Sequence, residues 1–217
     1  SHSSYSGIGV LKSSDKGKTW ENIDLPESHH ISRIVVNPKN SNEIIVGVLG
    51  HLYTKNNERG IYKTIDGGKT WSQPLFINDE TGIIDVSISP TDSNILFAAA
   101  WQKDRKAWNF KGNGAGSGIY KSTDFGSTWQ LVSTPTSGFP TGENIGRIGL
   151  FACNSKSVYA IVDNQNKRPS AKNEQPKDAN AALFETEVIG CEIYQSNDGG
   201  ISWAKKNKTF IDDMYYS

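Results

Sequence analysis

Four aspartates in this sequence stand beside hydroxyl side chains in the same eight-residue pattern. The pattern is [ST]-x-Asp-x-Gly-x-[ST]-Trp, and it reads SSDKGKTW, TIDGGKTW, STDFGSTW and SNDGGISW. An aspartate next to Ser and Thr is a candidate general acid or calcium ligand. A catalytic centre needs one constellation rather than four copies, and a calcium loop needs more oxygen-bearing side chains than each copy supplies. We therefore interpret this pattern, called the Asp motif below, as structural.

The Asp motif has the residue types of a hairpin turn. Its Asp can accept backbone N–H groups two or three residues on, and its Gly can adopt positive φ. Its Trp begins the next strand, and we expect it to pack beneath the hairpin. The predicted structural residues are Asp15, Gly17 and Trp20, then Asp66, Gly68 and Trp71, then Asp124, Gly126 and Trp129, then Asp198, Gly200 and Trp203.

Three further charged residues suggest chemistry on aligned strands. Counting back five positions from Pro38 and Pro90 gives Arg33 and Asp85, and we match Arg147 in IGRIGL to them. These three could grip an anionic or polyol ligand. Alternatively they form an ion-pair ladder between repeats, which is the interpretation we favour, because inner-strand charges need partners. Asp85 is the one catalytic candidate by position.

The elements that position these residues repeat as well. Each Asp motif lies between two short β-like runs, and farther upstream come two apolar runs around a polar turn, as in 32–50, 84–101 and 146–163. Four antiparallel strands (A to D) per repeat predict an all-β fold of β-propeller blades, with the Asp motif joining strands C and D.

The whole chain, 1–217, is then a partial β-propeller of about three and a half blades. A half blade covers 7–30, blades cover about 31–76, 83–132 and 145–206, and 207–217 leads into a further blade. Closed propellers usually have 4–8 blades. We therefore expect the rest of a larger propeller, or another chain, to complete the ring.

The loops between strands B and C should lie on the face opposite the Asp motifs and carry the function. They are 51–59, 102–117 and 163–190. The middle loop holds Arg105, Trp108 and Phe110, with Trp101 just before it, so Trp101, Arg105 and Trp108 join Arg33, Asp85 and Arg147 as predicted ligand-binding residues. An equally weighted alternative is that Trp108 and Phe110 only hold this long loop against its blade. We expect 112–118 to be flexible and the third loop to be mobile or disordered.

Histidines and cysteines give no metal or disulfide signal. His29, His30 and His51 lack metal-ligand spacing, so we expect surface histidines, no metal and no cofactor. Cys153 should end strand A and Cys191 should begin strand C at the other end of the blade, which predicts free thiols.

Charge and hydropathy exclude two classes of partner. Lys plus Arg and Asp plus Glu number 23 each, for a net charge of zero. This balance argues against nucleic acid and anionic membranes as partners. No apolar run approaches the ~18 residues of a membrane helix.

The Asp motifs resemble Asp-boxes, also called bacterial neuraminidase repeats. Their order, with GIYKTIDGGKTW after an NP-x-N-S-N element, is similar to sortilin-like and xyloglucanase-like propellers, including bacterial proteins labelled glycosyl hydrolase. The resemblance implies a secreted, periplasmic or cell-surface protein that binds a glycan, protein or peptide. The alternative is a xyloglucanase- or sialidase-like hydrolase, which needs two facing carboxylates. Asp104, Glu58 and Glu143 are further loop candidates, and the sialidase FRIP segment is absent.

Overall fold

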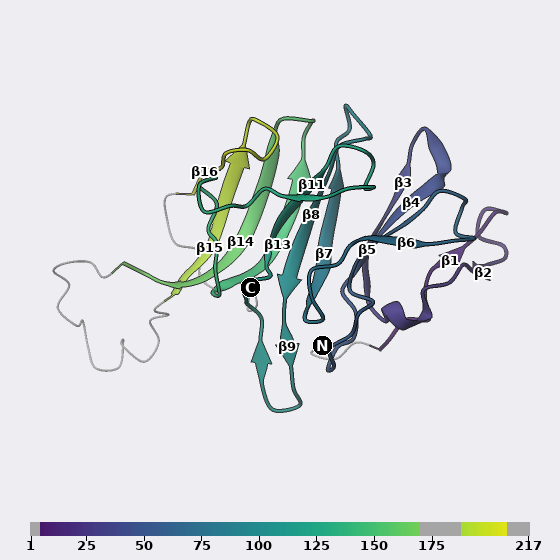
Figure 1. The fold of residues 1–217 in the computed structure, drawn as a ribbon, viewed down its shortest axis with the longest axis horizontal. Coiled ribbons are helices and arrows are strands. Elements are labelled where there is room, and N and C mark those ends of the chain that lie inside the picture. The colour runs from purple at the N-terminus through teal and green to yellow at the C-terminus, as the bar shows by residue number, and fades with distance from the viewer. Residues whose placement is uncertain (1–4, 170–187, 208–217) are drawn as a thin grey trace.

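The computed structural model describes residues 5–169 and 188–207, and within them the chain consists almost entirely of antiparallel β-strands. Three four-stranded sheets follow one another along the chain, after a two-stranded sheet (Figure 1). A further hairpin projects from the middle sheet on the side away from the Asp motif of the last sheet. The predicted fold class, all-β with propeller blades of four antiparallel strands, is confirmed.

The strand bounds follow the predicted repeat. The two-stranded sheet pairs β1 (Leu11–Lys12) with β2 (Glu21–Asn22). Sheet 1 is β3 (Ile31–Asn37), β4 (Asn40–Val48), β5 (Gly60–Thr64) and β6 (Ser72–Leu75). Sheet 2 is β7 (Thr81–Ile88), β8 (Leu96–Gln102), β11 (Gly118–Ser122) and β12 (Gln130–Leu131). Sheet 3 is β13 (Ile145–Ala152), β14 (Val158–Lys167), β15 (Val188–Ser196) and β16 (Ala204–Lys205).

Two smaller elements lie outside the four-stranded sheets. β9 (Asp104–Arg105) pairs with β10 (Phe110–Lys111), and η1 (Pro26–Ser28) is a single 3₁₀ turn between β2 and β3. Among residues 5–169 and 188–207, no helix has the length and apolar character needed to cross a membrane.

Strand β8 shows how the sheets stack face to face. Ala98 and Ala100 pack in a cluster with sheet 1, whereas Phe97 and Ala99 pack in a cluster with sheet 3. Successive side chains of a strand point to opposite faces. β8 is therefore apolar along its whole buried length because both of its faces are covered.

Three of the four Asp-motif tryptophans lie between successive sheets. Trp129 packs in the cluster between sheets 1 and 2, and Trp203 packs between sheets 2 and 3 with 6% of its surface exposed. Trp71 packs on the two-stranded sheet and donates its Nε1 to the carbonyl of Ile23 at 2.8 Å. Trp20 is 62% exposed, because no described sheet lies in front of it, so the expected burial fails there.

A lysine in the third strand of a repeat links it to the next repeat. Lys12 Nζ donates to the backbone carbonyl of Gly67 at 3.0 Å, and Lys121 Nζ donates to that of Gly199 at 2.8 Å. Each acceptor is the residue just after the Asp of the next motif, and each has positive φ. In sheet 3 the corresponding residue is Gln195.

Two loop predictions need correction. The middle B–C loop, given from the sequence as 102–117 without strands, contains the β9–β10 hairpin over 104–111. In the third loop, 163–167 and 188–190 extend β14 and β15. Its remaining predicted mobility concerns 170–187, which lie outside the described residues, as does most of the predicted lead-in at 207–217.

Candidate functional site

Each Asp motif forms a closed, hydrogen-bonded turn. Asp198 Oδ1 accepts the Ser196 hydroxyl at 2.8 Å and the Ser202 amide at 2.9 Å, and its Oδ2 accepts the Ser202 hydroxyl at 2.6 Å. The same three bonds recur in the other motifs. The motif glycine has positive φ in all four copies. Since both carboxylate oxygens already accept hydrogen bonds, the motif closes a turn rather than offering a free acid.

These hydrogen bonds hold the motif aspartates in their ionised form. The amide and then the hydroxyl of Thr19 lower the pKa of Asp15 to about 2. The hydroxyl and then the amide of Ser202 lower the pKa of Asp198 to about 2. The pKa values of the other two motif aspartates are lowered as well. A group with so low a pKa is a poor proton donor at neutral pH.

The inner strands β3, β7 and β13 border a shallow groove of about 500 Å³ that contains the Arg33–Asp85 pair. Arg33 donates from Nε and Nη2 to Asp85 Oδ1 at 3.1 and 2.9 Å, and the Leu150 amide donates to Oδ2 at 3.0 Å. Asp85 therefore joins three successive sheets. With both oxygens engaged, its geometry fits a role in sheet-to-sheet packing better than proton transfer.

Arg147 does not occupy the position equivalent to Asp85. Ile88 in β7 and Ala152 in β13 occupy equivalent positions in their sheets. Each pairs with a residue of the neighbouring strand, and that residue pairs with the first serine of the Asp motif in the strand after it. Asp85 lies three residues before Ile88, and the residue three before Ala152 is Gly149. Our sequence alignment therefore placed Arg147 wrongly, by two residues.

Arg147 instead belongs to a row of alternating cationic and aromatic side chains at the base of the β9–β10 hairpin. Its guanidinium lies 6.0 Å from the ring centroid of Trp101, Trp101 meets Phe110 edge-on at 6.1 Å, and Arg105 lies 5.5 Å from the Phe110 ring. Trp101 is buried and donates its Nε1 to the Gly112 carbonyl at 2.7 Å. The row thus braces the hairpin, and Trp101 offers no open ring face.

Trp108 lies in the turn between β9 and β10 and is 85% exposed. The neighbouring B–C loop carries Tyr53, which is half exposed. Lys103 ties the two loops together, because its Nζ donates to the carbonyls of His51 and Leu52 at 3.3 and 3.4 Å. Burial lowers the pKa of Lys103 to about 8. Two exposed aromatic rings therefore stand on connected loops of one face.

The loop carboxylates named from the sequence each have a polar partner. Asp104 and Glu143 form ion pairs with lysines of the hairpin region at 2.9 and 3.9 Å. Glu58 accepts the side-chain amide of Asn56 at 3.0 Å. A glycoside hydrolase needs an acid and a base or nucleophile that face each other across the substrate. These three side chains supply no such pair by themselves.

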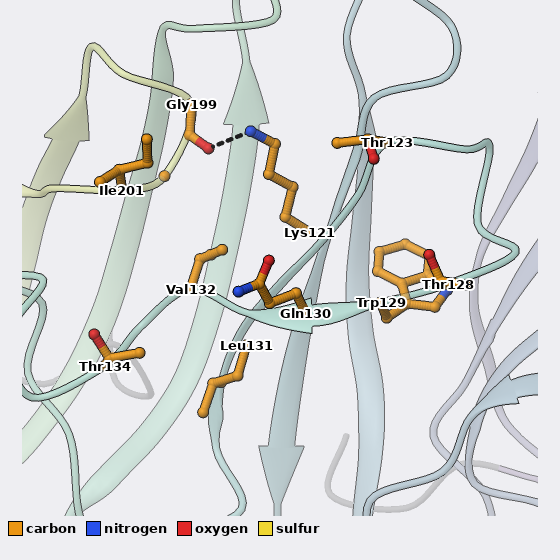
Figure 2. Close-up of a pocket in the computed structure, with 11 residues that line it drawn as sticks. Lys121, Thr123, Thr128, Trp129, Gln130, Leu131, Val132, Thr134, Gly199 and Ile201 are labelled. Carbon is orange, nitrogen blue, oxygen red and sulfur yellow. Dashed lines mark hydrogen bonds between the residues drawn. The ribbon is translucent and has the colours of Figure 1, made fainter.

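A second groove, of about 450 Å³, lies beside β12 and the Asp motif of sheet 3 (Figure 2). Trp129, Gln130 and Ile201 border it, and the hydrogen bond from Lys121 to Gly199 crosses one end. Among the described residues that line it, Lys121 alone is ionisable. Because this ammonium is already bonded to Gly199, the described lining offers contact surface but no catalytic group.

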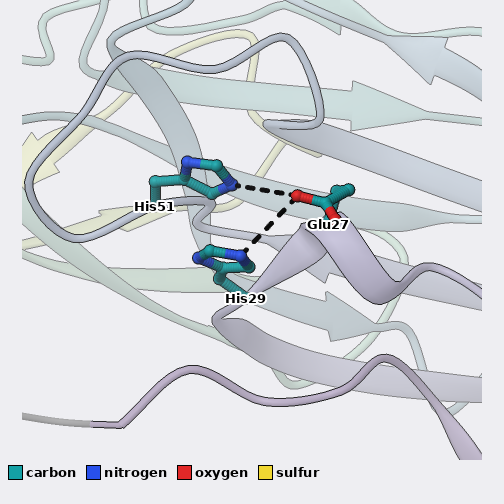
Figure 3. A group of neighbouring side chains, drawn as sticks. All are labelled: Glu27, His29 and His51. Atoms are coloured by element: carbon teal, nitrogen blue, oxygen red, sulfur yellow. Dashed lines mark ion pairs between the residues drawn. The ribbon is translucent and has the colours of Figure 1, made fainter.

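Glu27, His29 and His51 meet beside the first B–C loop (Figure 3). His29 Nε2 and His51 Nε2 lie 3.7 and 3.8 Å from the same oxygen, Glu27 Oε2. The two rings stack with their centroids 3.7 Å apart. Burial first, and then the charge of His29, lower the pKa of His51. Sequence reasoning missed this group, because η1 and the 51–59 loop meet only in the folded chain.

Comparison with known proteins gives one family and several distant relatives. A family model described as Sortilin, neurotensin receptor 3 (Sortilin-Vps10) matches residues 9–189. Xyloglucanase Xgh74A of Acetivibrio thermocellus is 28% identical over 142 residues, covering 57% of this chain and 16% of the relative.

One solved structure shares the fold of this chain, and a second matches it with a lower TM-score. The GH74 xyloglucanase from Xanthomonas campestris matches 93% of this chain and 27% of its own, with a TM-score of 0.61 at 15% identity. The GH74 enzyme from Niastella koreensis matches the same shares with a TM-score of 0.49 at 17% identity. The chain thus spans under a third of the length of these relatives.

Proposed function

We propose, from the premise that this chain belongs to the Sortilin-Vps10 family, that it is the recognition segment of a larger exported β-propeller protein and binds a glycan on the face formed by its B–C loops. The observation that carries the proposal is Trp108, 85% exposed on a braced hairpin. A large aromatic ring held open on a rigid support suits stacking against an uncharged sugar ring.

The glycan is a better match than a charged ligand on two grounds. The chain has no net charge, so long-range attraction to a polyanion is not built in. Two of the named relatives are xyloglucanases, which makes xyloglucan the first polysaccharide to test. Tyr53 and the polar side chains of the 51–59 loop, which Lys103 connects to the strand before the hairpin, would supply a second ring and hydrogen bonds on the same face.

The test is calorimetric titration of the purified protein with xyloglucan oligosaccharides and, separately, with a peptide library. We expect binding of the oligosaccharide, and a Trp108→Ala variant about tenfold weaker, which is roughly the 1.4 kcal/mol that one ring contact supplies. Trp20→Ala is the matched control, because Trp20 is also exposed but belongs to an Asp motif.

Each other outcome contradicts a stated part of the proposal. Absence of oligosaccharide binding, or binding that is indifferent to Trp108, overturns the glycan site. Binding of peptides through Trp108 keeps the surface but replaces the ligand class. Release of reducing ends from the polysaccharide would establish the hydrolase alternative instead, since the proposal assigns binding without cleavage.

We also propose that a further four-stranded sheet, from the rest of this protein or from another chain, covers the outer face of sheet 3. Phe97 and Ala99 in β8 are fully buried against sheet 3, whereas the equivalent residues of β14, Tyr159 and Ile161, are 38% and 37% exposed. An Ile161→Asp change should block this packing and leave the fold of the chain intact. Analytical ultracentrifugation would show association in the unchanged chain and its loss in the variant. Equal association of both rejects this interface.

A further inference from the structure

We propose that Glu27, His29 and His51 bind a divalent transition metal of the zinc class, at the junction between the η1 turn and the first B–C loop. Two imidazole nitrogens and one carboxylate oxygen are a frequent ligand set for zinc. Their ligand atoms all lie within 4.8 Å of one another. This site shares the 51–59 loop with the Trp108 surface, but it rests on different side chains and does not depend on the glycan proposal.

The distances within the group suit a shared cation better than direct hydrogen bonds. The two Nε2 atoms lie 3.7 and 3.8 Å from Glu27 Oε2, beyond hydrogen-bonding range. Ligands at ~2.0–2.1 Å around a tetrahedral zinc stand about 3.4 Å from one another. To complete the coordination, the two stacked rings, whose centroids lie 3.7 Å apart, would have to splay by side-chain rotation until their Nε2 lone pairs converge on one point beside the carboxylate. Figure 3 shows both rings directing one nitrogen toward the same oxygen.

The two ring nitrogens of His51 are arranged as in a metal-binding histidine. Its Nε2 is buried and has no hydrogen-bond partner among the described residues. Its other ring nitrogen, Nδ1, lies 2.9 Å from the Thr54 hydroxyl. In the tautomer whose Nδ1–H donates to the Thr54 hydroxyl, Nε2 carries the free lone pair, as in metal-bound histidines that are held by an outer partner.

The backbone on both sides of the group is held in place. Arg59 is fully buried, and its guanidinium donates to the carbonyls of Leu49, His51 and Thr54 at 2.6 to 3.0 Å. On the other side, His29 itself has positive φ, as do Asp24 and Leu25 just before η1. Such conformations are rare for residues with a side chain and persist only where the surroundings impose them. The ligands thus come from two fixed segments.

A bound metal would fasten the η1 turn to the loop that follows β4. Three protein ligands leave at least one coordination position for water or another ligand, as in open zinc sites. The expected result is a metal-dependent gain in stability, since a metal that binds the folded chain and not the unfolded chain raises the unfolding temperature.

The experiment uses the protein without a histidine tag, stripped with chelator and dialysed. Co²⁺ serves as the spectroscopic probe, and Zn²⁺ binding is measured by calorimetry and by the shift in unfolding temperature. We expect one Co²⁺ per chain with visible ligand-field bands. His51→Ala and Glu27→Gln should each weaken binding at least about tenfold, as loss of a ligand demands.

His30→Ala is the matched control, because His30 neighbours the site but directs its Nδ1 to the Gly50 carbonyl at 2.9 Å. It should keep the bands and the Zn²⁺ shift. Glu27→Gln preserves shape at an exposed position, so it decides the question even where His51→Ala fails to fold. Absence of the bands in the unchanged protein, or bands that persist in both ligand variants, overturns the site.

Discussion

Lys63 and Phe125, from successive sheets, are joined by a hydrogen bond in which the lysine Nζ donates to the phenylalanine carbonyl at 2.7 Å. The same ammonium donates to the Ser127 hydroxyl at 2.7 Å and lies 5.4 Å from the Phe125 ring centroid. Phe125 has φ of 49°, so the lysine secures a residue in an unfavourable backbone conformation. The bond holds two blades together at their Asp-motif ends.

Replacing Lys63 with Met should therefore destabilise the fold by roughly 1.5–3 kcal/mol, the range for hydrogen bonds to charged groups. The Phe125 carbonyl would lose its partner in a buried setting. Urea denaturation measures the change in unfolding free energy. Lys39→Met, at an exposed position before β4, is the control and should change it by less than about 0.5 kcal/mol. Equal losses of unfolding free energy in the two variants would contradict a stabilising role for the Lys63–Phe125 hydrogen bond.

The tryptophans allow a comparison at one motif position. Trp203→Ala should cost about 3–5 kcal/mol, because the ring is 6% exposed between sheets 2 and 3. Trp20→Ala should cost under about 1 kcal/mol, because that ring is 62% exposed. Chemical denaturation of the two variants tests this difference, and similar losses would show that the open position of Trp20 is misjudged.

The motif aspartates predict loss of stability in acid. The pKa of Asp198 is lowered from its ordinary 3.8 to about 2 in the fold, so the unfolded chain binds its proton first as pH falls. The stabilisation from this carboxylate is complete above the unfolded pKa and disappears between about pH 4 and pH 2.

Melting temperatures across that range provide the measurement. Asp198→Asn should be less stable than the unchanged protein at pH 7 and should show a smaller further decline toward pH 2. Glu21→Gln, on the exposed strand β2, should leave the profile unchanged. A profile for Asp198→Asn parallel to that of the unchanged protein would argue against a linked carboxylate.

The Arg33–Asp85 pair should respond unequally to loss of its two members. Arg33 is more than half exposed, so Arg33→Ala should cost under about 1 kcal/mol. Asp85→Ala should cost roughly 1–3 kcal/mol, because it strands the Leu150 amide in the joint with sheet 3. Urea denaturation distinguishes the two. If instead Asp85→Ala left stability unchanged and abolished a measured activity, Asp85 would be catalytic.

The two cysteines are free thiols, as predicted, and should differ in reactivity. Burial raises the pKa of Cys191 to about 11, so little thiolate is present at pH 8. Cys153 is only partly buried. A thiol reagent should label Cys153 first in the folded protein and both cysteines after denaturation, with Cys153→Ser removing the fast phase. Rapid labelling of Cys191 would mean that the third sheet opens.

The sequence was most informative where an interaction is local. The Asp motif carries its whole hydrogen-bond pattern within eight residues, so four copies sufficed to predict the blades and their turns. A lysine recurs in GVLK, GIYK and GIYK just before three of the motifs. The recurring lysine could have indicated the hydrogen bonds that link successive sheets. Its acceptor, a backbone carbonyl of the next Asp motif, could not be predicted from the sequence.

Other features depend on irregular or long-range geometry. The register of β13 shifts between Ile145 and Ile148, and Asn154 stands where the first two repeats have proline. Because that proline is missing from the third repeat, we aligned Arg147 with Asp85, whereas the equivalent residue is Gly149, two positions later. The Glu27–His29–His51 group combines two loops that only the packing of sheet 1 brings together, so no spacing rule could have found it.

The Asp motifs also bear on the order in which the chain folds. Their bonds join residues at most four positions apart, whereas the lysine joints between sheets span 55 to 78 positions. Short loops close in well under ~1 μs and hairpins form in ~1–10 μs, while distant contacts must first overcome a larger loss of chain entropy. The C–D hairpins are therefore expected to form early and independently. Each would then offer a finished edge on which the slower A and B strands of its own blade assemble.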